Sequence, residues 1–431
     1  MTTFTILTSG CAHNFSDSEQ MAGLLKEAKF DLIQDVETAD IIIFNTCTVK
    51  SPSESAFFTN LEKIKTQHPY KTIVIAGCIP QADPLNPKLK DYCLLGTRQI
   101  HKIVEVVEEA LNNNVVRLLE TGEMPPLNLP RVRRNPVVGV IPISLGCLGA
   151  CTFCKTKSAR FTLQSYPIAD IKREVEHALN DGVREIWLTS QDTFCYGFDL
   201  GTDLVALLKE LVTVSGEYMI RIGMGNPDHL PKIKQGLLEI YQHPKIFKFL
   251  HLPLQAGHDE TLKEMKRRYA VEDFVSAVQE FRAEIPEITI MTDIIVGYPT
   301  ETDEEYQATI EVMRKTTPAC INISRFWPRP GTKAAKLEPL PGEIVNHRSK
   351  TLTAIFQNIS QMQNERWQGW EGKIIIDEKG TQENQWIGRN FAYKPVLVDG
   401  NFKLGDRLDV KIIKTTTFDL RGEVIRREVI R

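Results

Sequence analysis

The side chains with the clearest chemistry are three cysteines, Cys147, Cys151 and Cys154, spaced C-x-x-x-C-x-x-C, with Phe153 directly before the last one. Three thiolates at this spacing can hold three corners of a four-iron cubane, whereas clusters built only for electron transfer usually take four cysteines. The fourth iron can then bind a reactant, as the open position of a catalytic metal does. The alternative is three buried structural thiols, but packing alone explains such close spacing poorly. The stretch therefore predicts an iron–sulfur cluster that binds a reactant.

A second group of cysteines, Cys11, Cys47 and Cys78, is dispersed in the sequence, and each follows the end of a short apolar run. Such runs are typical of buried parallel strands, and the carboxyl ends of parallel strands meet at one edge of a sheet, where ligands bind. We therefore expect the three thiols to converge on a second three-thiolate site. Two alternatives remain. Each cysteine could be a small buried hydrophobe, or the three could bind zinc with His13 as fourth ligand, although structural zinc usually has closely spaced ligand pairs.

Length and composition indicate a globular protein of about three domains. The chain has 431 residues, of which 42% are hydrophobic and 25% charged. No apolar run approaches the ~20 residues that cross a bilayer, and the first residues, MTTFTILTSG, do not have the pattern of a signal peptide. Nine cysteines without a secretion signal are typical of a reducing compartment. We expect a cytoplasmic protein with no membrane partner.

Net charge does not favour a general nucleic-acid binder, because it is −3 with a pI near 6.4. Residues 124–169, however, contain no Asp or Glu. The basic residues of this span are Arg131, Arg133, Arg134, Lys155, Lys157 and Arg160. We interpret them as a positive band around the cysteine motif that is available to phosphate groups. For residues 131–134, a solvated linker with a chance excess of charge is an equally good interpretation.

The elements that must position the second cysteine group lie in residues 1–112, where strand and helix patterns alternate. Strands are predicted at 5–8, 41–44 and 72–76, and helices at 18–28, 53–65 and 98–111. This alternation predicts an open parallel α/β sheet. Prolines at 125, 126, 130 and 136 indicate that residues 113–136 are an extended linker.

The elements that must position the first group lie in residues 137–362. The predicted strands are at 137–144, 184–189, 218–224, 247–252, 288–296 and 320–326. The helices between and after them are at 168–179, 204–211, 232–241, 261–267, 272–284 and 304–315. Six such repeats predict a partial or full TIM barrel, whose chemistry belongs at the carboxyl ends of the strands. The cysteine loop follows the first strand and is expected at that end, together with Ser190, Gln191, Asp192, Gln255, Asp293 and Arg325.

Residues 363–431 change in character, because short β-rich runs separated by Gly and Asn replace the helices. This pattern predicts a small β-barrel of the oligonucleotide-binding sort. Residues 365–431 hold 13 Lys and Arg against 11 Asp and Glu, so the domain is only mildly basic. RNA binding and a role as a structural cap are the two alternatives for this domain.

Together these features resemble the radical S-adenosylmethionine (SAM) methylthiotransferases over essentially the whole chain. The first matching motifs are SGC-x-x-N-x-x-D-S-E at 9–19, NTC at 45–47 and GC at 77–78. The others are TSQDT at 189–193, GMGNP at 223–227, HLPLQAG at 251–257, TDIIVGYPTETDEE at 292–305 and RPGTKAA at 329–335. The last domain looks like the family's TRAM domain, which engages tRNA. Departures are Ser9 and Ala150, and neither is a cluster ligand.

The resemblance implies two 4Fe–4S clusters with different tasks. Cys147, Cys151 and Cys154 would hold the one that cleaves SAM, and Cys11, Cys47 and Cys78 an auxiliary one that carries sulfur. It further implies that SAM serves as both methyl donor and radical source. The residues expected to contact the cofactor are Phe153, Ser190, Gln191, Asp192, Arg221, Gln255 and Asp293. Cys93, Cys195 and Cys320 match no ligand position and are interpreted as structural thiols.

The segment CTFCKTKSAR at 151–160 resembles the archaeal and eukaryotic branch of the family, which acts on threonylcarbamoyladenosine in tRNA. That substrate implies an adenosine in the anticodon loop as partner, read from single-stranded RNA. Isopentenyladenosine in tRNA and a ribosomal-protein aspartate are the alternative substrates. A more distant alternative is a non-catalytic RNA-binding protein with structural metal. The chemistry also requires an electron donor such as a flavodoxin or ferredoxin, and a sulfur source.

Overall fold

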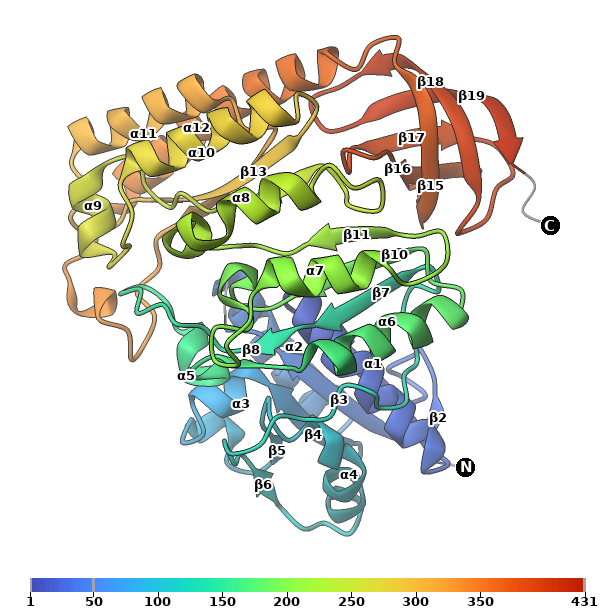
Figure 1. The fold of residues 1–431 in the computed structure, drawn as a ribbon. Helices are drawn as coiled ribbons and strands as arrows, with labels where there is room; N and C mark the ends of the chain where they lie inside the picture. Colours follow the sequence, from blue (N-terminus) through green and yellow to red (C-terminus); the bar gives the residue numbers. More distant parts are fainter. Residues whose placement is uncertain (1, 49–50, 429–431) are drawn as a thin grey trace.

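The computed structural model describes residues 2–48 and 51–428, and these fall into three parts along the chain (Figure 1). An N-terminal sheet covered by helices lies beside a partial barrel of alternating strands and helices. A small closed β-barrel follows at the C-terminal end. The predicted α/β class and all three architectures are confirmed. In the described part of the chain, no helix is both long enough and apolar enough to span a membrane.

The N-terminal sheet has six parallel strands in the order β2-β1-β3-β4-β5-β6. Its strands are β1 (Thr3–Thr8), β2 (Asp31–Leu32), β3 (Ile41–Thr46), β4 (Thr72–Gly77), β5 (Cys93–Leu95) and β6 (Arg117–Leu118). Helices α1 (Ala12–Glu27) and α4 (Ile103–Leu111) pack on one face, and α2 (Ser51–Gln67) and α3 (Cys78–Ala82) on the other. With both faces covered, β3 is buried along its whole length.

Two expectations for this region need correction. The helix expected at 18–28 begins at Ala12, directly after Cys11, because the polar first turns of α1 are buried rather than exposed. The sheet also continues past residue 112, since β6 pairs with β5 inside the segment expected to be a linker.

The central region forms a barrel of six parallel strands that does not close. Its strands are β7 (Val138–Pro142), β10 (Glu185–Thr189), β11 (Met219–Ile222), β12 (Phe249–His251), β13 (Thr289–Val296) and β14 (Cys320–Arg325). They form two three-stranded sheets, β11-β10-β7 and β12-β13-β14, which an isolated bridge between Ile220 and Ile246 joins. Of the two predicted forms, partial or full, the structure therefore has the partial barrel.

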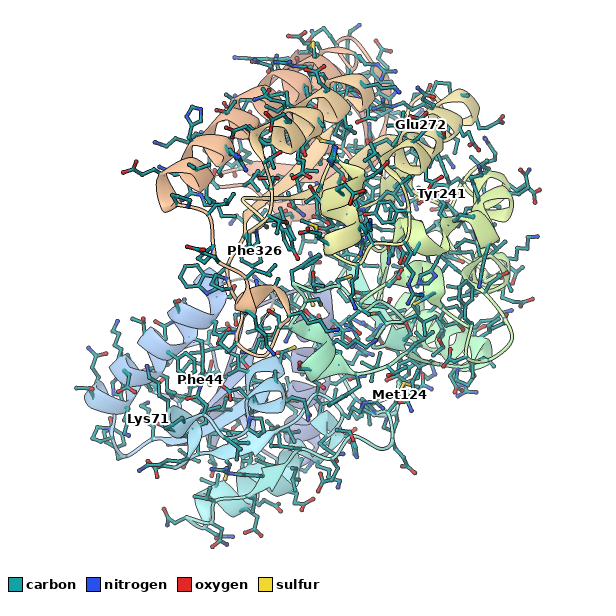
Figure 2. All side chains as sticks on the ribbon, turned by 90° about the vertical axis from the view of Figure 1, so that its left-hand side faces the viewer. Phe44, Lys71, Met124, Tyr241, Glu272 and Phe326 are labelled. Carbon is teal, nitrogen blue, oxygen red and sulfur yellow. The ribbon has the colours of Figure 1, made fainter. Side chains whose placement is uncertain are left out.

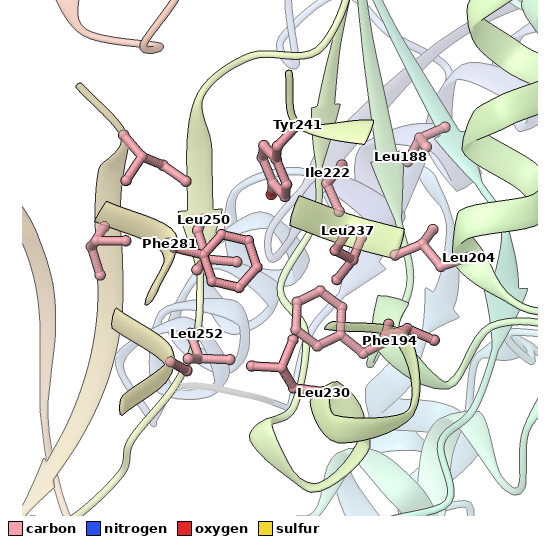
Figure 3. Packing of buried hydrophobic residues seen from close by; sticks show 14 of the residues in the cluster. Leu188, Phe194, Leu204, Ile222, Leu230, Leu237, Tyr241, Leu250, Leu252 and Phe281 are labelled. Carbon is pink, nitrogen blue, oxygen red and sulfur yellow. The ribbon is translucent and has the colours of Figure 1, made fainter. Parts of the chain in front are cut away.

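Helices cover the outside of this barrel and share one large apolar core with its strands. They are α6 (Ile168–Asn180), α7 (Leu204–Val212), α8 (Leu230–Ile240), α9 (Asp259–Glu264), α10 (Val271–Glu284), α11 (Asp303–Thr316) and α12 (Gly342–Glu365). Figure 3 shows part of that core, with Phe194, Leu230 and Leu237 between the strands and the helices. Ala12, at the start of α1, packs against the buried cluster that contains Val138 and Val140 of β7. The N-terminal domain therefore lies against the open side of the barrel.

The C-terminal β-barrel closes in the order β15-β16-β17-β19-β18. Its strands are β15 (Glu371–Lys379), β16 (Gln385–Arg389), β17 (Pro395–Asp399), β18 (Arg407–Thr415) and β19 (Leu420–Glu428). It contacts the segments that precede the central strands. Lys248, just before β12, donates its backbone N–H to Phe391 O at 2.8 Å, and Glu217, just before β11, pairs with Arg407 at 2.6 Å. The C-terminal barrel therefore covers the amino ends of the central strands.

Candidate functional site

The loop that carries Cys147, Cys151 and Cys154 lies between β8 (Ser144–Leu145) and α5 (Thr156–Arg160), beyond the carboxyl end of β7. Gly146 begins the loop with φ +74°, and a Cβ there would lie 2.3 Å from Thr162 O, so only glycine fits. Its N–H donates to Gln191 Oε1 at 2.7 Å, which fixes the loop to the end of β10.

Arg267 holds the middle cysteine of this loop. Its Nη1 donates to Cys151 Sγ at 3.2 Å, while Nη2 and Nε donate to Asn226 Oδ1 at 2.6 Å and to Tyr269 OH at 3.0 Å. These three partners fix the orientation of the guanidinium. A charged donor of this kind stabilises a thiolate more strongly than a thiol.

The thiols of this loop fit a metal cluster. Burial raises the pKa of Cys147 to about 12, and the neighbouring Cys154 adds to the shift. Burial also raises the pKa of Cys151. Such thiols are weak acids by themselves, and a bound metal centre would offset the cost of deprotonating them. The three donors therefore suit a cationic cluster better than three separate structural roles.

The three cysteines of the second group lie at the carboxyl ends of neighbouring strands of the N-terminal sheet. Cys11 directly precedes α1, Cys47 follows β3, and Cys78 is the first residue of α3 after β4. A Cβ built on Gly10 would lie 2.7 Å from Cys47 Cβ, so the chain next to Cys11 touches Cys47. Cys11 and Cys78 are also close enough for a thiolate at Cys11 to raise the pKa of Cys78, on top of the larger effect of burial.

Two buried asparagines, Asn14 and Asn45, connect the end of β3 to α1 in this second site. Asn14 Nδ2 donates to Thr46 O at 3.0 Å, and Asn45 Nδ2 donates to Asn14 O at 2.7 Å and to Ser18 Oγ at 2.8 Å. Cys11 Sγ lies 3.3 Å from Asn14 Oδ1. The positions of Cys11 and Cys47 are therefore set by a network in which both amides are engaged.

Arg160, from α5 of the central domain, enters this second site. Its side chain is buried and Nη2 pairs with Asp17 Oδ2 at 2.6 Å. It lies against the Cys78 thiol and near Cys11, and its Nη1 has no nitrogen or oxygen partner among the described residues. A buried guanidinium beside two thiols fits an anionic sulfur centre, because charged N–H donors bind such a centre strongly.

The two cysteine groups face one another across the domain boundary. Arg329 donates a hydrogen bond through Nη1 to Thr48 O, next to Cys47. Burial lowers the pKa of Arg329, and the negative charges of Cys154, Glu54 and Cys47 oppose that shift. One guanidinium is therefore within electrostatic reach of a cysteine from each group. Gln191 makes a second link, since its Nε2 lies 3.5 Å from His13 Nδ1 of the N-terminal domain.

The geometry does not favour the zinc alternative. Sulfur ligands of one zinc ion lie about 3.8 Å apart, given Zn–S bonds of about 2.3 Å. Among the described residues, neither cysteine group brings its three sulfurs within 4.8 Å of one another. A cubane, whose cysteines bind separate irons, accepts the wider spacing. His13 faces Gln191 and Asp17 through its two ring nitrogens.

Comparison with known proteins assigns these parts. Residues 141–313 match the model of the radical SAM superfamily, residues 3–92 match "Uncharacterized protein family UPF0004", and residues 366–425 match the TRAM domain. The threonylcarbamoyladenosine tRNA methylthiotransferases of Danio rerio and Homo sapiens are each 39% identical. The alignments cover 98% of this chain and 78% of the fish protein, and 97% and 73% for the human one. The chain belongs to the threonylcarbamoyladenosine tRNA methylthiotransferase family.

An archaeal relative supports the same assignment along nearly its whole length. The "probable threonylcarbamoyladenosine tRNA methylthiotransferase" of Pyrococcus abyssi is 38% identical over 96% of this chain and 98% of its own. The predicted resemblance to the archaeal and eukaryotic branch is therefore confirmed, and the chain is a radical SAM enzyme of the methylthiotransferase kind.

Solved structures with low sequence identity share the fold of this methylthiotransferase. The radical SAM methyltransferase TsrM from Kitasatospora setae, solved with cobalamin and a [4Fe-4S] cluster, has a TM-score of 0.57 at 14% identity, over 78% of this chain and 77% of its own. The cobalamin-dependent radical SAM enzyme OxsB has a TM-score of 0.53 at 13% identity, over 82% of this chain and 56% of its own. These likenesses extend to the fold alone.

The predicted cofactor contacts of the methylthiotransferase fall into two groups. Near the cysteine loop, Ser190 Oγ accepts from Asp192 N at 3.0 Å, and Asp192 Oδ1 accepts from the backbone of Asn226 and Phe194. Asp192 is buried, and its Oδ2 makes no hydrogen bond to a described residue but lies 3.5 Å from His229 Nε2. Asp192 therefore presents a carboxylate oxygen near Cys147, whose pKa it raises.

The other predicted contacts lie elsewhere or point to other partners. Arg221 is stacked over Trp187, Phe249 and Tyr393, with its guanidinium carbon 4.9–5.4 Å from the ring centres. Asp293 pairs with His251 at 2.9 Å and accepts from Asn322 at 2.7 Å. The backbone N–H of Gln255 donates to Asp293 O at 2.8 Å. Phe153 is half-buried and packs against the barrel core.

The positive band expected around the cysteine motif is not free to bind phosphate. Arg131 is buried and pairs with Glu174 at 2.7 Å, and Arg133 pairs with Asp181 at 3.1 Å. Lys155 lies 3.7 Å from Glu54, Lys157 donates to Gly149 O at 2.7 Å, and Arg160 is buried. Arg134 stacks on Phe15. Most of the band instead fastens domains and loops together, so this interpretation was wrong.

Sequence reasoning missed three arginines of the site, because their roles depend on how distant segments pack. Arg267 follows α9, Arg160 was counted in the positive band, and Arg329 was noted only as part of a motif. For Arg329 the RPGTKAA motif was a usable signal, since arginine between prolines has little reason to be structural. For Arg267 the sequence holds no comparable signal.

Proposed function

We propose that this methylthiotransferase converts N-threonylcarbamoyladenosine next to the anticodon of tRNA to its 2-methylthio derivative. The observation that carries the proposal is that Arg329 and Gln191 link the chain beside the two cysteine groups, one group from each domain. Replacing a C–H bond by C–S needs both a hydrogen-abstracting agent and a sulfur carrier within one site. The names of the relatives supply the substrate, and the TRAM match supports an RNA.

The cofactors in this proposal are two 4Fe–4S clusters and SAM. Cys147, Cys151 and Cys154 would hold one cluster, and Cys11, Cys47 and Cys78 the other. When bound, these groups supply an electron, sulfur, a methyl group and the radical that a C–H bond without activation requires. The remaining tasks of binding, orientation and charge balance belong to the chain.

Near the first cluster site, the chain's own residues orient the reactants. Arg267 holds Cys151, and Gln191 fixes the loop through Gly146. Asp192 Oδ2 suits the amino group of SAM, because a buried carboxylate oxygen that makes no hydrogen bond to a described residue gains from a cationic donor. Ser190 orients that carboxylate by accepting from the Asp192 backbone.

Near the second site, positive charge compensates a sulfur-rich anion. Arg160 and Asp17 form a buried pair that places a guanidinium against Cys78. Arg329 adds a second cation toward Cys47. An electron donor such as a flavodoxin or ferredoxin and a separate sulfur source complete the reaction. The cytoplasm, where tRNA is found and thiols stay reduced, is its proposed location.

Nucleoside analysis of tRNA tests the proposal. Cells that lack this chain should accumulate threonylcarbamoyladenosine and lose its 2-methylthio derivative in mass spectra. The wild-type chain should restore the product, and Cys147→Ala should not. An unchanged level of 2-methylthio-threonylcarbamoyladenosine would sink the proposal, whereas loss of methylthio-isopentenyladenosine instead would move it to the other tRNA substrate.

A further inference from the structure

A segment after β14, residues 326–334, contacts residues next to both cysteine groups and is called the strap here. Phe326 begins it, with its N–H bonded to Val296 O and its ring 5.5 Å from that of Tyr298. Arg329 in its middle bonds Thr48 O of the N-terminal domain. Ala334 at its end donates to Thr152 O, between Cys151 and Phe153. Figure 2 shows Phe326 where the central region approaches the N-terminal domain.

Trp327 is the large hydrophobic residue of the strap that is exposed. The residue is 60% exposed, between the packed Phe326 and the anchored Arg329. The strap is fixed on both sides of Trp327, so the exposed side chain is held at a defined place on a segment that contacts Thr48 and Thr152, next to Cys47 and Cys151. A large exposed aromatic held in this way is typical of a binding surface rather than of a core.

The strap also lies in an acid-free part of the chain. Residues 316–337 contain no Asp or Glu and carry Arg325, Arg329, Lys333 and Lys336. Arg325, Lys333 and Lys336 are exposed, and none pairs with a carboxylate of a described residue.

Two exposed lysines, Lys266 and Lys333 of the strap, are neighbours. The nearby Lys333 amine lowers the pKa of Lys266, and Lys266 has no carboxylate partner among the described residues. Lys266 is next to Arg267, which holds Cys151, and Lys333 is next to Ala334, which bonds Thr152 O. Two neighbouring amines without a carboxylate partner attract an anion.

We propose that the strap and Lys266 form a landing surface for single-stranded RNA. The base next to the target stacks on Trp327, and the phosphates beside it bind the amines of Lys266 and Lys333. An exposed aromatic with interspersed cations is how single-stranded nucleic acid is held, because every base has a face that stacks and every linkage carries a charge. The identity of the RNA rests on the proposed function. The new part of the proposal is that Trp327, Lys266 and Lys333 bind that RNA.

The two kinds of contact predict different signatures. Loss of the Trp327 stack should weaken binding roughly 5- to 100-fold, the range that stacking of one base gives, without changing the dependence on salt. Loss of one phosphate contact should weaken binding less and reduce the slope of log affinity against log salt by about 0.7.

The test is fluorescence anisotropy of the full chain, reconstituted without oxygen, with a labelled anticodon stem–loop carrying threonylcarbamoyladenosine. The variants are Trp327→Ala, Trp327→Phe, Lys266→Gln and Lys333→Gln. Matched controls are Tyr70→Ala, whose ring is 79% exposed on the N-terminal domain, and Lys209→Gln on α7. Iron content checks that each variant folds.

We expect Trp327→Ala to weaken binding at least fivefold at an unchanged salt slope, and Trp327→Phe to restore most of the loss. Each lysine variant should lower the slope, and both controls should match the wild type. If Trp327→Ala and Trp327→Phe both bind within twofold of the wild type, the landing surface is wrong while the proposed function stands. If the wild type itself does not bind the stem–loop, both fail.

Discussion

Buried charge is the main physical problem at the scale of single residues in this site. Arg160 and Asp17 are 1% and 3% exposed and make a 2.6 Å contact that joins two domains. Such pairs add little over apolar residues of the same size, but removal of one partner leaves a charge without solvent or counter-ion. Substitutions at this pair therefore test how the second site is assembled, without a measurement of enzyme activity.

Arg160→Met should lower the free energy of unfolding of the metal-free protein by about 3–5 kcal/mol, because it strands the Asp17 carboxylate. Arg160→Met/Asp17→Leu should recover most of that loss, since no unpaired charge remains. Urea unfolding measures both. Arg173→Met is the control, because its pair with Asp170 is exposed and should be worth less than about 1 kcal/mol. Equal costs for the two single variants would contradict the account.

Residue types in the site were predictable, but contacts were not. The six cysteines could be found from spacing and from their places after strands, because both follow from local sequence. Arg160, Arg267 and Arg329 reach the cysteines only through packing between domains. The prediction of a positive band available to phosphate was wrong for the same reason. The acidic partners of residues 131–160 come from α1, α2 and α6, which lie elsewhere in the sequence.

At the scale of elements, the strands and most helices of the central barrel lie within a few residues of the predicted ranges, because their apolar patterns are clear. Helix α1 was predicted six residues too short. Its first turns carry His13, Asn14, Ser16 and Asp17, all buried between the sheet and the barrel, and such polar burial has no hydrophobic period. The 24-residue α12 was missed for a related reason, since polar residues are spread around it.

The cysteine loop is the element whose shape depends most on one residue. Gly146→Ala should displace the loop, because the added methyl would meet Thr162 O and the residue would keep a left-handed φ. We expect the iron bound after reconstitution to fall by roughly half, with the share held by the second site retained. Iron analysis measures this.

Gly122→Ala is the matched control, because nothing lies within 4 Å of its added methyl. It should bind as much iron as the wild type. Full iron in Gly146→Ala would show that the loop accepts the substitution and that its backbone geometry is not needed for the cluster.

At the scale of the whole molecule, the two ends of the central barrel have different roles. Both cysteine groups lie at the carboxyl ends of strands, whereas the TRAM domain covers the amino ends. A tRNA that contacts both must therefore extend along the outside of the barrel. The junction with the TRAM domain is itself unusual, since Glu185 is buried there near Asp377, Arg389 and Arg221.

This junction predicts a pH dependence of stability. Burial and the neighbouring Asp377 raise the pKa of Glu185 from 4.5 to about 8, against the opposing effect of Arg389. The folded protein therefore keeps the proton that the unfolded chain releases. The contribution of Glu185 to the free energy of unfolding should be greatest below about pH 4.5. It should fall as the pH rises toward 8, by up to about 1.4 kcal/mol per pH unit.

Glu185→Gln should remove that contribution, so the fall in melting temperature between pH 5 and 8 should be smaller than in the wild type. Glu239→Gln, an exposed position on α8, should leave the fall unchanged. Thermal unfolding across this range measures all three proteins. Parallel curves for Glu185→Gln and the wild type would mean that Glu185 is ionised in the folded junction.

The central claim is that each domain brings one cluster to a shared site, and iron analysis of anaerobically reconstituted protein tests it most directly. The wild type should hold about eight irons per chain, two clusters of four. Replacing Cys147, Cys151 and Cys154 by alanine should leave about four, and so should replacing Cys11, Cys47 and Cys78, with SAM cleavage kept only in the latter. A wild type with about four irons, unchanged when Cys11, Cys47 and Cys78 are lost, would contradict the account.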